Sequence, residues 1–225
     1  MKINLLEVSL KTARDLGEMG CDKYRNAPYV YQKITEELSE INEELEKKIK
    51  GQECGKDGIM GESIDFLISI MDMAYLIEPK ETAESLAKKL NIDDITNKVW
   101  HENVGLKEMK LELEKMFKGK DVSIDDFGVV SQKISTLLTQ VGNLSIAVQM
   151  IEGTTYKKPE KYGFNNVNEF MISVLKDMTY QARIIFEVAY KEECKLQEMP
   201  EMNEKMTEIW INKTAKWRKS RGLPE

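Results

Sequence analysis

Four acidic residues in the first third of the chain form two pairs with the same spacing. Glu37 and Glu40 lie three residues apart within EELSE, and Glu62 and Asp65 lie three apart within ESID. Residues three apart are neighbours on a helix surface, so each pair would present two carboxylates side by side. If the two segments pack as antiparallel helices, the four acids converge into one cluster. Carboxylate oxygens without His or Cys suit Mg²⁺ or Mn²⁺.

The first pair belongs to a long amphipathic segment. At about 100° per residue, Glu37 lies roughly 70° from the centre of its apolar stripe, and Glu40 lies about 130° away on the same flank. Glu36 points nearly opposite to the stripe, into water. Glu37 therefore lies at the edge of the core, and Glu40 lies farther from it. The stripe consists of Val30, Ile34, Leu38, Ile41, Leu45 and Ile49.

The second pair belongs to the most apolar segment, GESIDFLISIMDMAYLIEPK (61–80). Glu62, Asp65, Ser69 and Asp72 fall within a sector of about 80°, and the rest of the helix is apolar almost all round, so it should be buried. Buried carboxylates must be neutralised by a cation, by hydrogen bonds or by protonation. No Lys or Arg between residues 57 and 79 does this locally.

Helical periodicity extends along the whole chain and predicts an all-α helical bundle. The expected helices are 2–17, 28–50, 61–77, 81–90, 105–118, 124–151, 165–195 and 201–219. Strand signals are scarce.

A helical hairpin is also predicted to occur twice, near 28–78 and 127–190. KITEELSEI is echoed by KISTLLTQV and DMAY by DMTY, whereas the acids of the first copy become Thr136, Leu137 and Gln140. The chain is thus read as an acidic half (1–120) and a degenerate half with a basic C-terminal helix (121–225), in one compact domain.

Asp72 has an apparent counterpart, Asp177, in the half that has lost the other acids. An acid that occurs in both halves, although one half lacks the cluster, is expected to have a structural, hydrogen-bonding role. The alternative is that Asp72 holds the metal ligands in position through hydrogen bonds.

Composition excludes several classes of protein. The 225 residues carry a formal charge of −6, which argues against a nucleic-acid binder. The single histidine, His101, excludes the paired Glu-x-x-His ligands of di-iron bundles. Three unpaired cysteines and apolar runs too short for a bilayer predict a cytoplasmic protein without membrane contact.

Two further groups could contact a ligand. Cations near the C-terminus (Lys213, Lys216, Arg218 and Arg221) could clamp phosphates, or they could serve only as favourable charges at a helix end. Tyr24 and Asn26 could contact a base, although packing is an alternative role for both. Trp217, among the cations, would belong to a lid or an interface.

EELSE followed, after residues 41–61, by ESID resembles the ExxE…ExxD signature of the all-α nucleoside triphosphate pyrophosphatases, which include MazG and the dimeric dUTPases. The upstream KYRNAPYVYQKI and the basic ending NKTAKWRKSRGLPE are also similar to MazG-like proteins. The specific resemblance covers roughly residues 20–80.

The resemblance implies a MazG-like helical bundle in which Glu37, Glu40, Glu62 and Asp65 bind Mg²⁺ (or Mn²⁺) and form the catalytic centre. Water would attack the α-phosphorus of a nucleoside or deoxynucleoside triphosphate, releasing the monophosphate and pyrophosphate. The family also favours a homodimer, with a monomer as the alternative. Two alternatives remain: a non-catalytic nucleotide- or metal-binding module descended from such an enzyme, and a helical interaction protein.

Overall fold

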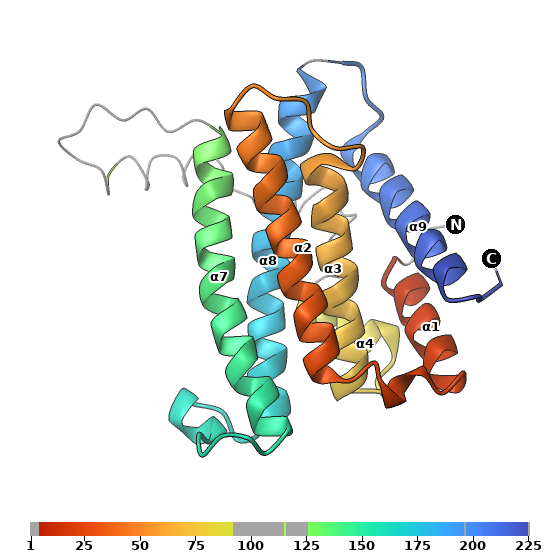
Figure 1. The fold of residues 1–225 in the computed structure, drawn as a ribbon, viewed down its shortest axis with the longest axis vertical. Helices are drawn as coiled ribbons and strands as arrows, with labels where there is room; N and C mark the ends of the chain where they lie inside the picture. Colours follow the sequence, from red (N-terminus) through yellow and green to blue (C-terminus); the bar gives the residue numbers. More distant parts are fainter. Residues whose placement is uncertain (1–4, 92–114, 116–125, 196, 225) are drawn as a thin grey trace.

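The computed structural model describes residues 5–91, 115, 126–195 and 197–224, and regular secondary structure in these residues is entirely helical (Figure 1). The prediction of an all-α protein is therefore confirmed for the described part of the chain. The expected helix 105–118 and His101 lie outside the described residues, apart from residue 115. The helices are α1 (Leu5–Glu18), η1 (Cys21–Lys23), α2 (Ala27–Ile49), α3 (Gly58–Ile77), α4 (Ala83–Leu90), α7 (Asp126–Ile151), η2 (Pro159–Tyr162), α8 (Val167–Cys194) and α9 (Met202–Ser220).

Four long helices form the central bundle (Figure 1). The hairpins α2–α3 and α7–α8 lie against each other, with α2 packed on α7 and α3 packed on α8. Helices α1 and α9 pack on α3 and on each other, and α4 packs on α8. The C-terminal helix α9 therefore lies on the half of the chain that carries the acids. A common origin of the two hairpins stays a prediction.

Helix α3 lies at the centre of the fold, in contact with α1, α2, α8 and α9. Its sequence is apolar almost all round, and 15 of its 20 residues are buried, as expected. The stripe of α2 is buried from Val30 to Leu45. Ile49 is an exception: it is the last residue of α2, beyond the buried turns, and it is 64% exposed.

The connection between α2 and α3 is tied to α2 by Glu44. The buried Glu44 carboxylate accepts a hydrogen bond from the Gly55 amide (2.7 Å) and pairs with Lys47 (2.5 Å). A Cβ on residue 55 would lie 2.9 Å from Glu44 Oε1, so glycine permits this approach. The attachment helps to hold the start of α3 beside α2, and hence to set which residues of the two helices face each other.

By length and apolar composition, α7 is the one helix among the described residues that could span a membrane. It packs in the bundle against α2 and α8, and core helices of proteins without a membrane span pass the same test. The cytoplasmic location stays a prediction.

Candidate functional site

Three of the four predicted acids come together between α2 and α3. Glu37, Glu40 and Glu62 are half-buried, and each offers a carboxylate oxygen that lies within 4.8 Å of the others. We call these three residues the glutamate cluster. Glu36, one residue earlier on α2, is exposed and pairs with Lys33 (2.5 Å), as the helical angle predicts.

Asp65 lies one helical turn beyond Glu62 and has a different partner. Its carboxylate accepts a hydrogen bond from Lys213 of α9, which also donates to Asp57 (2.7 Å). The geometry therefore differs from the four-ligand set expected from the sequence. The reason is that α9 brings a buried cation onto the face of α3, which has no cation of its own.

The electrostatics of the cluster show a shortage of positive charge. Burial, together with the neighbouring carboxylates of Asp65 and Glu40, raises the pKa of Glu37 to about 8. Burial also raises the pKa of Glu62 to about 7, although Lys213 acts in the opposite direction. The pKa of Asp65 is raised by burial and only partly compensated by its hydrogen bond from Lys213. A divalent cation would supply the missing charge.

The donor set fits magnesium or manganese. All three groups offer carboxylate oxygens, the hard ligands that these ions take in proteins. The three oxygens are at most 4.8 Å apart, and one ion with ligands at about 2.1 Å spans up to about 4.2 Å between opposite ligands. Such an ion would be held by Glu37, Glu40 and Glu62.

In the absence of divalent ions, we expect the protein to become less stable as the pH rises from about 5 to about 8. The folded-state pKa values of Glu37 and Glu62 lie above the usual value for glutamate. The folded protein therefore binds more protons than the unfolded chain across this range, and its free energy of unfolding falls as pH increases. Thermal unfolding in EDTA at pH 5.5, 7 and 8 measures this trend.

Saturating Mg²⁺ should raise the melting temperature more at pH 8 than at pH 5.5, because the ion competes with protons for the same oxygens. In the variant Glu37→Gln, stability should depend less on pH and less on Mg²⁺ than it does in the wild type. Such a change would assign both dependences to the glutamate cluster and not to the net charge of the protein. A magnesium effect that is equal at the two pH values would contradict this assignment.

A cavity of about 340 Å³ adjoins the cluster. Of the three glutamates, Glu37 lines it, together with Asp65. The other walls carry cations and two aromatic rings from the start of α2 and the end of α9. The lining residues are Arg25, Tyr29, Val30, Lys33, Glu37, Asp65, Ile68, Ser69, Asp72, Lys213, Lys216, Trp217, Ser220 and Arg221.

The four predicted phosphate-binding cations divide between two faces of α9. Lys213, Lys216 and Arg221 line the cavity, and Arg221 donates a hydrogen bond to the Tyr29 hydroxyl (2.9 Å). Arg218 instead pairs with Asp15 of α1 (2.7 Å) and does not line the cavity, because it lies on the side of α9 that faces α1.

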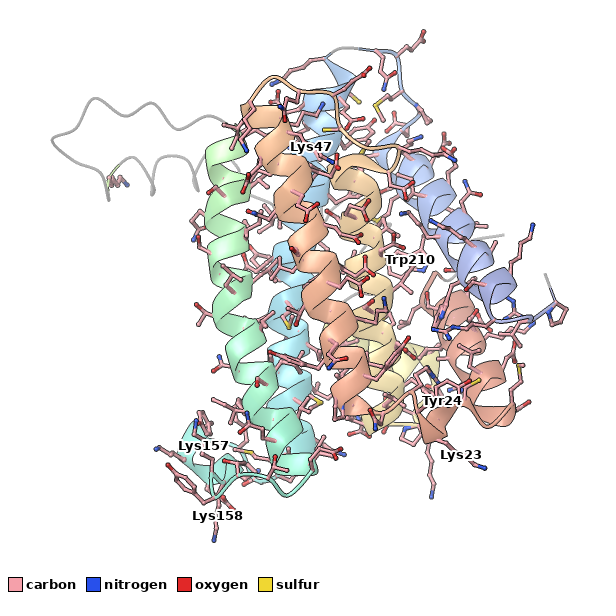
Figure 2. All side chains as sticks on the ribbon, in the orientation of Figure 1. Lys23, Tyr24, Lys47, Lys157, Lys158 and Trp210 are labelled. Atoms are coloured by element: carbon pink, nitrogen blue, oxygen red, sulfur yellow. The ribbon has the colours of Figure 1, made fainter. Side chains whose placement is uncertain are left out.

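The two predicted base-binding residues do not line the cavity either. Tyr24 is 58% exposed and donates to Cys21 Sγ (2.9 Å); Figure 2 labels it next to Lys23. Asn26 caps α2 by accepting a hydrogen bond from the Tyr29 amide (3.1 Å). The aromatic rings that line the cavity are those of Tyr29 and Trp217.

Two cations that line the cavity, Lys33 and Arg25, were not predicted from the sequence. Lys33 precedes Glu37 by one helical turn, and that spacing was a signal that it shares the face of α2 next to the cavity. Arg25 is buried, forms an ion pair with Asp72, and donates to the Ala13 carbonyl (2.9 Å). No local pattern indicates this pair, since its members are 47 residues apart. The pair agrees with the structural role expected for Asp72.

Comparisons of the chain with models of known protein families, with curated protein sequences and with solved structures find no significant match.

Proposed function

We propose that this protein is a divalent-metal-dependent pyrophosphohydrolase that converts a nucleoside or deoxynucleoside triphosphate to the monophosphate and pyrophosphate. One observation carries the proposal: the glutamate cluster adjoins a cavity that is also lined by cations. Glu37 belongs to both the cluster and the cavity lining, and Lys33, Lys216 and Arg221 line the same space.

The cavity has the size and chemistry for a nucleotide. Its volume of about 340 Å³ lies within the range of roughly 300–1,000 Å³ typical of small-molecule sites. The cations would bind phosphate oxygens through charge-assisted hydrogen bonds, and Tyr29 and Trp217 offer faces on which a base could stack. The chain's resemblance to the MazG-like pyrophosphatases points to the same ligand class.

The reaction requires a new bond between a water oxygen and the α-phosphorus. The bond from the α-phosphorus to its bridging oxygen breaks, and that oxygen leaves with pyrophosphate. When bound, Mg²⁺ offsets phosphate charge and lowers the pKa of water. Glu37 borders the cavity, so we assign it to accept the proton of the attacking water.

A panel of nucleoside and deoxynucleoside triphosphates with Mg²⁺ tests the proposal, with pyrophosphate and monophosphate as the measured products. Hydrolysis in ¹⁸O-labelled water should place the label in the monophosphate, since attack occurs at the α-phosphorus. Release of inorganic phosphate, or no turnover of any nucleotide, would refute the proposed reaction. Magnesium-dependent binding without turnover would select the non-catalytic alternative. Sedimentation of the same sample tests the homodimer.

Replacing Lys216 or Arg221 by Ala should raise the KM for the nucleotide roughly 10–100-fold, because each loses a charged hydrogen bond worth about 1.5–3 kcal/mol. Steady-state kinetics with the best substrate of the panel measure this change. Lys219→Ala is the matched control, since Lys219 lies on the same helix turn but does not line the cavity. Equal KM values for all three variants would argue against a phosphate clamp.

A further inference from the structure

A buried lysine holds two carboxylates beside the glutamate cluster. Lys213 donates to Asp57 (2.7 Å) and to Asp65, and its side chain is 7% exposed. The three residues come from α9, from the residue before α3 and from the second turn of α3. The ammonium group is therefore shared by two acids next to the three glutamates.

The fold makes room for this lysine. A Cβ on residue 61 would lie 2.7 Å from Asp57 Cβ and 3.5 Å from Lys213 Cε, so Gly61 allows the aspartate and the lysine to approach α3. One turn before Lys213, Trp210 is fully buried and donates to the Ser9 hydroxyl (2.7 Å), which anchors α9 against α1 (Figure 2 marks Trp210). Trp210 and Lys213 are three residues apart on α9, so the anchoring of Trp210 against α1 helps to fix the position of Lys213.

We propose that the Lys213 ammonium takes the place of a second divalent cation, so that the site binds one ion, on Glu37, Glu40 and Glu62. This inference rests on the metal site of the proposed function. Clusters of carboxylates of this size commonly hold two ions about 3.5–4 Å apart. Here a compact ammonium, fixed by its side chain, already pairs with both Asp57 and Asp65.

Displacement of Lys213 by an ion is unfavourable. The side chain is buried, so losing its two acids would leave an unpaired charge away from water or require α9 to separate from α3. The two aspartates consequently stay with the lysine when the glutamates bind an ion. Asp65 then acts as a positioning residue, which keeps Lys213 at the border of the cavity.

The number of bound ions tests the proposal. Manganese is titrated into the full-length protein without nucleotide, and free Mn²⁺ is measured by electron paramagnetic resonance. We expect one ion per chain for the wild type, one for Lys213→Arg and two for Lys213→Ala. In Lys213→Ala, Asp65 loses its hydrogen-bonded lysine and Asp57 keeps only the exposed Lys216 at 3.9 Å. Lys219→Ala is the control, because Lys219 is exposed in the wild type, and this variant should bind one ion.

Two tight ions in the wild type, or a single ion in Lys213→Ala, would overturn the proposal. Should Lys213→Ala fold poorly, Mn²⁺ should raise its melting temperature more than that of the wild type, and an equal rise would count against the inference. The titration contains no nucleotide, so its result does not depend on catalysis. If the wild type binds one ion but hydrolyses no nucleotide, the proposed reaction is refuted and the one-ion inference stands. A wild type that binds no Mn²⁺ refutes both.

Discussion

Replacing Glu37 by Gln is expected to lower the rate of pyrophosphate release about 10²–10⁴-fold, the usual contribution of a positioned general base. The amide keeps the shape of the side chain but removes both a charged metal ligand and the proton acceptor that borders the cavity. Initial rates at saturating Mg²⁺ and nucleotide measure the loss. The effect should appear in kcat, because Glu37 acts on the attacking water more than on nucleotide binding.

The same variant should be more stable than the wild type when no divalent ion is present. Burial and the repulsion from Asp65 and Glu40 oppose the charge of Glu37, and glutamine removes that charge. A gain in stability with a loss of activity distinguishes a functional carboxylate from a structural one. Glu46→Gln is the matched control: its side chain is exposed on the same helix and does not line the cavity, so the rate should stay unchanged and stability should change by no more than about 0.5 kcal/mol. Full activity in Glu37→Gln would remove this residue from the mechanism.

Replacing Asp72 by Ala is expected to cost about 3 kcal/mol of stability, at the lower end of the range for breaking a buried ion pair. Arg25 would lose a partner in a buried position, although it would keep Asp22 (2.6 Å) and the Ala13 carbonyl. For a chain of this length, that loss corresponds to a fall in melting temperature of roughly 6–12 °C. Thermal and urea unfolding measure it.

The control for Asp72 lies in the second hairpin. Asp177 occupies the matching place in DMTY, but it is exposed and only accepts a long hydrogen bond from Gln140 (3.4 Å). Asp177→Ala should change stability by no more than about 0.5 kcal/mol. Comparable losses in the two variants would show that burial and the pairing with Arg25 are not what makes Asp72 important.

The helical content of the described chain and the faces of the acids could be predicted from sequence. The spacing of apolar residues on α2 places Glu37 and Glu40 on one flank and Glu36 in water, and the structure agrees. The apolar character of α3 likewise predicts its burial. These features depend on residues three or four positions apart, because helix geometry relates such residues directly.

The roles of Asp65 and Asp72 required the tertiary structure. Both are acids on the same sector of α3, and the sequence offers each several partners. Packing brings Lys213 to Asp65 from 148 residues away and Arg25 to Asp72 from 47 residues away. Packing also turns Arg218 toward α1 and Arg221 toward the cavity, although both belong to one basic segment.

The sequence by itself determined that this protein forms amphipathic helices with paired carboxylates, since helical periodicity is a property of the local chain. Only the tertiary structure decided which acids face one another and which face a cation. That choice depends on how α9 lies against α3, and therefore on the packing of the whole molecule. Within the described part of the chain, no lysine or arginine forms an ion pair with the three glutamates, and they form the candidate metal site.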